Sequence, residues 1–278
     1  MGLLADMQRA SHERVAAAKA RAAEAELRAR IADSPPPPPL VLANGGFDVI
    51  AELKLRSPAQ GALAHQASDP VVRLAAYAKG GAAAVSVLTE PTRFDGSLEH
   101  LRLAAETLAP QRVPVMRKDF LVDPYQLLEA RERGASGVLL ILQMVERARL
   151  IEMLDCAAEL GLFVLLEAFD AGDLEMAAEI AAERGGRSEQ VLMGLNCRNL
   201  ETLAIDPRRF GVLRDKLPAG WPSVAESGVE SPRDAAAVAA LGYRLALVGT
   251  SLMKHKDAAR ATARLIEAGR GACKSSHA

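Results

Sequence analysis

The sequence predicts a (β/α)8 barrel (TIM barrel) with an N-terminal helical extension. The chain has 278 residues, which is enough for one large α/β domain. Eight short apolar runs recur along it, and helix-like segments separate each run from the next. At roughly 30 residues per repeat, eight strand–helix units form a barrel of this kind. The apolar runs begin near Val49, Ala83, Val113, Gly137, Leu162, Val191, Ser223 and Leu245.

The residues before the first run have a different composition. Met1 to about Ile31 is rich in Ala, Arg and Glu, which predicts a helix on propensity. A stiff, extended spacer follows, from Pro35 to Pro39. We therefore divide the chain into an N-terminal helix with a proline-rich linker, residues 1–40, and a barrel, residues 41–278. The narrow apolar face of the predicted helix carries Leu3, Leu4, Met7 and Val15.

The segments between the apolar runs have recognisable helix starts. Ser or Asp followed by Pro or by an acidic residue suits a helix N-cap and first turn. The alternative architecture, an open doubly wound sheet, calls for a Gly-rich turn after its first strand, and Leu55-Arg56-Ser57-Pro58 is not one. We therefore expect the closed barrel. The predicted helix starts are Ser68-Asp69-Pro70, Ser97-Leu98-Glu99, Asp123-Pro124, Asp206-Pro207 and Ser231-Pro232.

Composition argues against several classes of function. The 34 basic residues nearly balance the 35 acidic ones, which gives no electrostatic reason to expect nucleic acid or a membrane surface as a partner. No apolar run approaches the length that spans a bilayer. The three cysteines and five histidines are scattered, so we expect no disulfide framework, zinc site or histidine triad. The N-terminus lacks the apolar core of a signal peptide, and four acidic residues argue against a transit peptide. We expect a cytoplasmic protein.

Charged residues stand where the predicted strands end. The run Val113–Phe120 contains Lys118 at its end, and strand alternation places Met116 and Lys118 on one face and Arg117 on the other. Catalytic groups of barrel enzymes gather at the C-terminal ends of the strands. The residues found at these ends are Glu52, Lys54, Lys118, Glu167, Asn196, Glu226 and Gly249.

Their joint occurrence predicts an active site. A single charged residue at a strand end is usually a solvated rim residue, but two lysines and three glutamates would share one small opening. Burying them costs several kcal/mol unless they pair or shift their pKa values. A lysine that acts as an acid near neutral pH needs a lowered pKa, and we expect Lys54 and Lys118 to lower each other's pKa. Glu167 would be tuned as a base.

Two turns predict a phosphate site. Glu226-Ser-Gly-Val229 and Val248-Gly-Thr-Ser251 follow the seventh and eighth predicted strands. Barrel enzymes commonly bind phosphate through backbone N–H groups of these two loops. The glycines allow the ligand to approach closely, and the hydroxyl groups add donors. The predicted phosphate-binding residues are Gly228, Gly249, Thr250 and Ser251, with Ser227 beside the substrate.

The sixth strand and the apolar residues near the strand ends predict the rest of the site. Asn196-Cys-Arg-Asn-Leu200 offers Asn196 and Arg198 to orient a carboxylate or hydroxyl groups. No histidine is placed to activate Cys197, which we interpret as a packing residue. An apolar wall for a flat ring is predicted from Phe94, Phe120 and Leu142.

With these residues in view, the chain resembles the indole-3-glycerol phosphate synthase family, from Ile50 to Met253. Several motifs in the same order carry the resemblance, and the leading helix is similar to the family's N-terminal extension over the barrel opening. The motifs are Ile50-Ala-Glu-Leu-Lys-Leu-Arg-Ser-Pro58, Ser86-Val-Leu-Thr-Glu90, Phe94-Asp-Gly-Ser97, Arg117-Lys-Asp-Phe120, Tyr125-Gln126, Leu166-Glu167, Gly194-Leu-Asn-Cys-Arg-Asn-Leu200, Glu226-Ser-Gly228 and Gly249-Thr-Ser-Leu-Met253.

The resemblance implies a carbon–carbon lyase that converts 1-(2-carboxyphenylamino)-1-deoxyribulose 5-phosphate into indole-3-glycerol phosphate, without metal or organic cofactor. It implies that Lys118 is the general acid and Glu167 a general base. It also implies that Lys54, with Glu52 beside it, holds the substrate carboxylate and serves in the dehydration. The residues that it implies for substrate positioning are Asn196, Arg198, Glu226 and Ser57, and those for phosphate are Gly228, Gly249 and Thr250.

Two other functions stay open at this stage. One is another phosphate-binding barrel enzyme, such as phosphoribosylanthranilate isomerase, which leaves Lys54, Lys118 and Glu167 without a clear use. The other is a barrel that binds a sugar phosphate without catalysis. The expected partner in each case is a small molecule derived from a sugar phosphate, and the oligomeric state is open, with a monomer as the working expectation.

Overall fold

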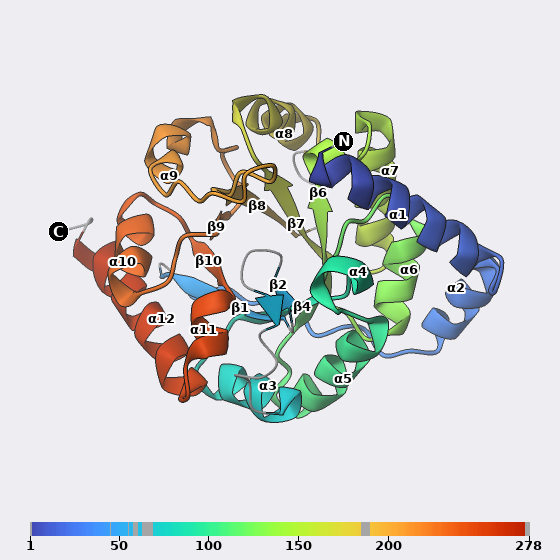
Figure 1. Cartoon of the computed structure of the whole chain (residues 1–278), viewed down its shortest axis with the longest axis horizontal. Coiled ribbons are helices and arrows are strands. Elements are labelled where there is room, and N and C mark those ends of the chain that lie inside the picture. Colours follow the sequence, from blue (N-terminus) through green and yellow to red (C-terminus); the bar gives the residue numbers. More distant parts are fainter. Residues whose placement is uncertain are drawn as a thin grey trace.

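The computed structural model describes residues 2–44, 46–54, 56–57, 61–62, 69–184 and 190–275, with backbone only at 57, 61–62 and 274–275. Within these ranges, eight parallel strands close into a barrel in the order β1-β10-β9-β8-β7-β6-β5-β4 (Figure 1). Each begins within two residues of the predicted position, so the predicted fold class is confirmed. The strands are β1 (Asp48–Leu53), β4 (Ala84–Leu88), β5 (Val115–Lys118), β6 (Gly137–Ile141), β7 (Phe163–Ala168), β8 (Val191–Asn196), β9 (Ser223–Glu226) and β10 (Leu245–Val248).

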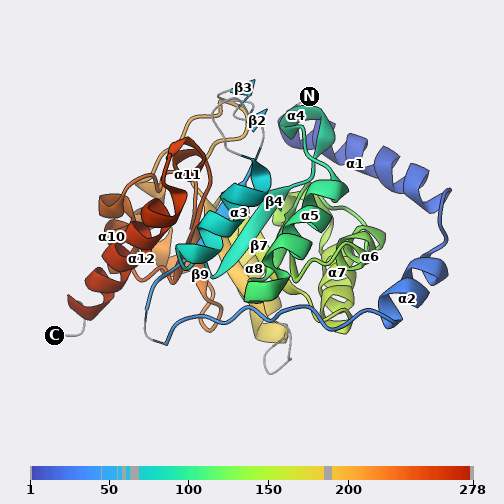
Figure 2. The same cartoon turned by 90° about the horizontal axis from the view of Figure 1, so that it is seen from below.

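Helices surround the barrel, and a short hairpin lies at one end of it (Figures 1 and 2). The hairpin is β2 (Arg56–Ser57) with β3 (Gly61–Ala62). The helices are α1 (Leu3–Lys19), α2 (Glu24–Ala32), α3 (Pro70–Lys79), α4 (Pro91–Phe94), α5 (Leu98–Leu108), α6 (Tyr125–Glu132), α7 (Arg147–Glu159), α8 (Ala171–Glu183), α9 (Arg209–Val212), α10 (Pro232–Ala240), α11 (Thr250–Lys254) and α12 (Ala258–Ser275), with 3-10 turns η2 (Ala109–Gln111), η3 (Leu142–Met144) and η4 (Arg214–Lys216).

Three of the five predicted helix starts have a side-chain cap, whereas α6 and α9 have Pro124 and Arg208 at the N-cap, without a side-chain cap hydrogen bond. Asp69 accepts a hydrogen bond from the backbone N–H of Val71 at the start of α3. Ser97 caps α5, and Ser231 forms a capping box with Asp234 at the start of α10. These bonds satisfy donors that a helix leaves unpaired in its first turn. Ser68, Leu55 and Pro58 lie outside the described residues.

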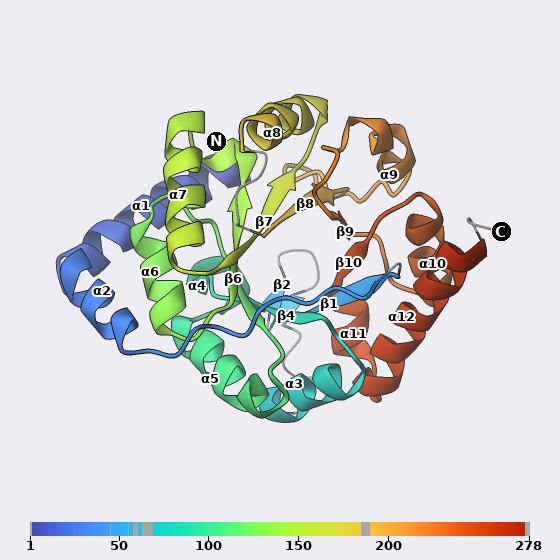
Figure 3. The ribbon, with the colours of Figure 1, turned by 180° about the vertical axis from the view of Figure 1, so that it is seen from behind.

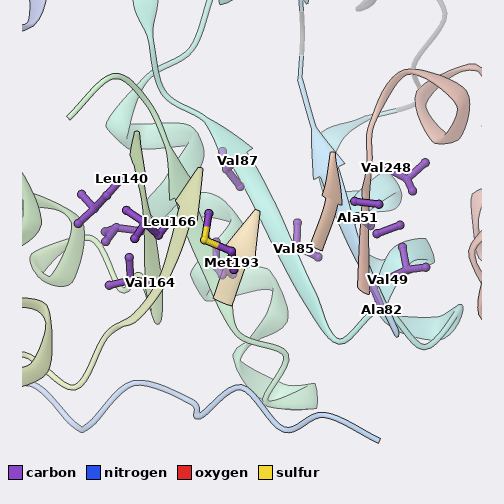
Figure 4. Packing of buried hydrophobic residues seen from close by; sticks show 14 of the residues in the cluster. Val49, Ala51, Ala82, Val85, Val87, Leu140, Val164, Leu166, Met193 and Val248 are labelled. Atoms are coloured by element: carbon purple, nitrogen blue, oxygen red, sulfur yellow. The ribbon is translucent and has the colours of Figure 1, made fainter. Parts of the chain in front are cut away.

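Strand alternation divides the core into two layers. Residues such as Val49, Val164 and Met193 point outward and pack beneath the helices (Figure 4). Residues such as Ile50 and Met116 point inward and fill the barrel. This two-sided burial explains why the strands are continuous apolar runs. It also leaves the charged strand ends at one end of the barrel.

The N-terminal segment forms two helices, so the prediction of one helix up to about Ile31 was wrong. The break falls between α1 and α2 (Figure 2). There the hydroxyl of Tyr125 donates to the carbonyls of Ala18, at 3.2 Å, and Ala22, at 2.9 Å. Leu27 of α2 belongs to the same small apolar cluster as Tyr125 and Leu128. Docking on α6 therefore overrides the helix propensity of the alanine-rich sequence.

The proline segment, residues 33–44, crosses the N-terminal end of the barrel on its way from α2 to β1 (Figures 2 and 3). Arg131 donates to the carbonyl of Pro35 at 2.6 Å, and Gln190 donates to the carbonyl of Leu40 at 3.1 Å. The side chain of Leu40 is buried in the same cluster as the barrel interior. Leu40 thus closes the end of the barrel opposite to the charged strand ends.

Candidate active site

A cavity opens at the C-terminal ends of the barrel strands, and nearly all the residues predicted for the site line it. It also receives Leu3 from α1. The predicted residues that line this cavity are Glu52, Lys54, Phe94, Lys118, Phe120, Glu167, Asn196, Arg198, Glu226, Ser227, Gly228, Gly249, Thr250 and Ser251.

Lys118 stands at the centre of the charged groups. Its Nζ lies 3.1 Å from Oε2 of Glu167 and 3.3 Å from Oε2 of Glu226. Both carboxyl side chains are almost fully buried. Burial by itself would lower the pKa of Lys118, but the charges of Glu167, Glu226 and Glu52 outweigh it and raise that pKa. The ammonium group of Lys118 is therefore charged.

This reverses one expectation about the lysines. We expected two neighbouring ammonium groups to lower each other's pKa. Instead, Nζ of Lys54 lies 2.9 Å from Oε1 of Glu52, and Lys118 has carboxyl partners of its own. Each lysine is neutralised by acid groups, so the expected lowering of the pKa of Lys118 was wrong.

Glu52 is held as a carboxylate. Burial by itself would raise its pKa, but Lys54, Lys118 and Arg198 lower it below the ordinary value. Gly249 allows this carboxylate its position, because a Cβ at residue 249 would overlap Oε1 of Glu52. Gly249, at the end of β10, therefore makes room for the side chain of Glu52 on the neighbouring strand β1.

Glu167 is oriented by its neighbour on β8. Nδ2 of Asn196 donates to Oε1 of Glu167 at 3.1 Å. Oδ1 of Asn196 accepts from the backbone N–H of Arg198 at 2.9 Å. Because its amide is fixed from both sides, Asn196 leaves Oε2 of Glu167 directed at Lys118.

Glu226 differs from Glu52 in the direction of its pKa shift. Burial and the negative charge of Glu167 raise its pKa well above 4.5, against the opposing effect of Lys118. Its Oε1 is buried without a hydrogen-bond partner among the described residues. A Cβ at Gly194 would overlap this oxygen. Sequence reasoning did not single out Gly194 as the residue that makes room for Glu226, although a glycine inside a strand often marks a close approach.

The two predicted phosphate turns face the same cavity. Ser227 and Gly228 have positive φ angles of 62° and 87°, a conformation that turns the chain sharply after β9. Gly249, Thr250 and Ser251 lie where β10 passes into α11. Oγ of Ser251 is buried and has no partner among the described residues. This hydroxyl is available to a bound group.

Two of the three predicted wall residues line the cavity, and one does not. The rings of Phe94 and Phe120 lie 6.3 Å apart, tilted by 36°. Leu142 was a wrong prediction: it begins η3 and packs in the outer core. Alternation along β6 directs Leu139 and Ile141 to the cavity instead. The side chain of Ser57 lies outside the described residues.

Two further observations concern metals and membranes. Among the described residues, no group of three or more His, Cys, Asp or Glu side chains is arranged to hold a metal ion. Within the same residues, no helix combines the length and apolar character needed to cross a membrane.

Together the barrel and its cavity define a class of protein: a (β/α)8-barrel enzyme with paired lysines and carboxyls in a cavity at the C-terminal ends of its strands. A family model described as indole-3-glycerol phosphate synthase matches residues 4–265. The chain belongs to the indole-3-glycerol phosphate synthase family. Its function is that of the family, a decarboxylating carbon–carbon lyase of tryptophan biosynthesis.

Individual relatives agree with this assignment. The chain is 42% identical over 238 residues to the indole-3-glycerol phosphate synthase of Parafrankia sp. (strain EAN1pec), covering 84% of this chain and 83% of the relative. It is 43% identical over 243 residues to that of Nocardioides sp. (strain ATCC BAA-499 / JS614), covering 87% and 89%.

Solved structures support the fold alone. Thiamine phosphate pyrophosphorylase from Pyrococcus furiosus superimposes with a TM-score of 0.57 at 15% identity, over 82% of this chain and 98% of that one. Yersinia pestis DHPS gives a TM-score of 0.56 at 15% identity, over 86% and 99%.

Proposed function

We propose that this chain closes the indole ring of 1-(2-carboxyphenylamino)-1-deoxyribulose 5-phosphate with Lys118 as the general acid. The observation that carries the proposal is the meeting of Lys118 with Glu167 and Glu226 at 3.1 and 3.3 Å. These groups line one cavity with the Glu52–Lys54 pair and the two glycine turns. A substrate with a carboxylate, a ketone and a phosphate has a partner there for each group.

The substrate would lie across the cavity. Its phosphate is bound by backbone N–H groups at Gly228, Gly249 and Thr250 and by the unpartnered hydroxyl of Ser251. Its aromatic ring packs against Phe94 and Phe120. Lys54 and Arg198 are the cations nearest to the place of the carboxylate, and Arg198 is preoriented by a hydrogen bond from Nη1 to the carbonyl of Leu203 at 3.0 Å.

Ring closure needs a proton at the ketone oxygen. As the ring carbon attacks the ketone carbon, the carbonyl π electrons move to the oxygen, and Lys118 transfers a proton to it. Lys118 is protonated before the attack, because nearby carboxylates raise its pKa. The proton then passes to the oxygen because the alkoxide that develops there is a stronger base than the lysine amine. The buried ammonium also stabilises the oxygen electrostatically. Carbon dioxide then leaves, and the electron pair of the broken bond returns to the ring.

Dehydration needs an acid and a base. The new hydroxyl group leaves as water after it accepts a proton, for which Lys54 is the donor. Glu167 removes a proton from the intermediate, so that the indole double bond forms. Glu52 holds Lys54. Glu226, whose raised pKa favours the protonated form, donates a hydrogen bond to the sugar hydroxyls. Neither step requires a metal ion or an organic cofactor.

The remaining expectations belong to the same proposal. The catalytic groups come from residues 41–278, whereas residues 1–40 supply the helix beside the barrel opening and, from it, Leu3. The balance of 34 basic against 35 acidic residues supports a small-molecule partner rather than nucleic acid. We propose that the chain works as a cytoplasmic monomer, which light scattering of the purified protein would test.

Turnover by the purified protein tests the central claim. Wild-type protein given the carboxyphenylamino substrate should produce indole fluorescence. Lys118→Ala should lose a factor of about 10² to 10⁴ in turnover, the usual contribution of a general acid. It should still bind a phosphate-containing substrate analogue in calorimetry. Lys79→Ala, at the exposed end of α3, is the matched control and should behave as wild type. Absence of fluorescence with wild-type protein would overturn the proposed function.

A further inference from the structure

Asp119, which directly follows Lys118, collects hydrogen bonds from several elements. Its side chain is wholly buried, with an exposed fraction of 0%. Oδ1 accepts from Nη2 of Arg14 at 2.9 Å and from the backbone N–H of Phe120 at 2.8 Å. Oδ2 accepts from Nη1 of Arg14 at 3.1 Å, from Oγ1 of Thr89 at 2.7 Å and from Nη2 of Arg117 at 3.2 Å.

These bonds connect α1 to two strand ends. Arg14 comes from α1, Thr89 follows β4, and Arg117 lies in β5. The guanidinium group of Arg14 meets both carboxylate oxygens, an arrangement that fixes orientation as well as distance. The backbone N–H of Thr89 also donates to the carbonyl of Lys118 at 3.1 Å. The main chain of Lys118 is thus fixed through its own carbonyl and through the residue that follows.

A second residue of α1 holds the next backbone group. Oγ of Ser11 donates to the carbonyl of Phe120 at 2.5 Å, and Nε2 of Gln126 donates to Oγ of Ser11 at 3.0 Å. Ser11 and Arg14 are three residues apart and therefore share one helix face. The N-terminal helix therefore holds the chain just beyond the catalytic lysine and beside the ring of Phe120.

We propose that Arg14 is a positioning residue, which through Asp119 fixes Lys118 and Phe120 in their working places. The inference rests on the proposed function of Lys118. Arg14 touches no reacting atom, so its loss should alter the placement of the lysine rather than remove an acid. A displacement of about 1 Å at a reacting group costs on the order of 10²-fold in rate.

The variant Arg14→Met keeps roughly the length and the apolar part of the side chain but removes the guanidinium group that binds Asp119. Turnover at saturating substrate should fall by about 10- to 100-fold, with a smaller change in KM. Arg14→Lys, which restores the charge but not the bidentate contact, should recover only part of the loss. Arg9→Met is the matched control, because Arg9 lies on the same helix and pairs with Asp6 on the surface.

A double variant at Arg14 and Asp119 tests whether Arg14 acts through Asp119 or only through the general stability of the protein. If Arg14 acts through Asp119, the double variant Arg14→Met/Asp119→Asn should turn over no more slowly than Asp119→Asn alone. Amide hydrogen exchange over residues 115–123 should also become faster in Arg14→Met than in Arg9→Met. This exchange experiment does not depend on activity.

The outcomes are distinct. Equal turnover in Arg14→Met and Arg9→Met overturns the inference, as does multiplication of the two losses in the double variant. Unchanged exchange over residues 115–123 also overturns it, whether or not the wild-type protein makes an indole product. A wild-type protein without that product overturns the proposed function instead.

Discussion

Nζ of Lys118 lies 3.1 Å from Oε2 of Glu167, although 49 residues separate them in the sequence. The barrel brings them together, since β5 and β7 are both neighbours of β6. The same lysine also reaches Glu226 on β9, so three strand ends share one ammonium group. The charge of Lys118 therefore depends on carboxyl groups that come from two other strands.

Glu226→Gln should change how stability depends on pH. The pKa of Glu226 is raised above 4.5 in the folded protein, so the folded state holds this proton more tightly than the unfolded chain. The resulting stabilisation is complete below about pH 4.5 and is lost as pH rises through the raised pKa. The free energy of unfolding of wild type minus that of Glu226→Gln should therefore fall with rising pH. Urea unfolding across pH 4 to 9 measures it, and Glu13→Gln, an exposed glutamate on α1, should show no such trend.

Glu52→Gln should show the opposite sign. The pKa of Glu52 is lowered in the folded protein, chiefly by Lys54 acting against burial. Its stabilisation is present above about pH 4.5 and is lost as pH falls through the lowered pKa. At pH 7 the variant should lose about 3 kcal/mol, because it leaves a buried lysine without its partner. The deficit should shrink in acid; a deficit that stays constant down to the acid end of the titration would contradict the assignment.

Gly194→Ala should impair catalysis more than its size suggests. The new Cβ would overlap Oε1 of Glu226 and lie 3.1 Å from Cδ1 of Leu165. Displacement of the carboxyl group should reduce turnover by about 10²-fold, and overpacking should cost about 1–3 kcal/mol. Steady-state kinetics and thermal unfolding check both effects. Gly211→Ala, where a Cβ meets nothing within 4 Å, is the control; equal kinetics in the two variants would refute the steric argument.

Leu40→Ala should reduce stability and leave the chemistry unchanged. Leu40 is buried at the end of the barrel opposite to the cavity. Truncation of a buried leucine costs about 2–5 kcal/mol, whereas kcat and KM should stay at wild-type values. Val41→Ala changes the next side chain, which is 74% exposed, and should shift stability by no more than about 0.5 kcal/mol. A loss of activity in folded Leu40→Ala would show that the two ends of the barrel are coupled.

The strand ends were predictable because burial on both sides leaves a strong signal. A continuous apolar run that stops at Lys118, Glu167 or Glu226 contrasts sharply with the residues around it. Period-two alternation then gave the correct direction of Lys118 and of Arg117, which pairs with Asp119 behind the strand. Local pattern was sufficient wherever the strand itself fixes the side chain.

The errors concern contacts made by distant parts of the chain. The break after α1 depends on Tyr125, about a hundred residues away, and no local feature marks it. Leu142 was misplaced because the strand ends one residue earlier and the chain turns into η3. The direction of the pKa shift of Lys118 depends on which carboxyl groups reach it, and only the closed barrel determines that.

Residues 33–44, which include Leu40, cover the N-terminal end of the barrel, and the interior above them is packed with side chains. As far as the described residues show, the cavity opens at the C-terminal end of the barrel, where Leu3 of α1 lines it. Carbon dioxide, water and the finished indole must depart along the route by which the next substrate arrives. The products must therefore leave this opening before the next substrate can bind.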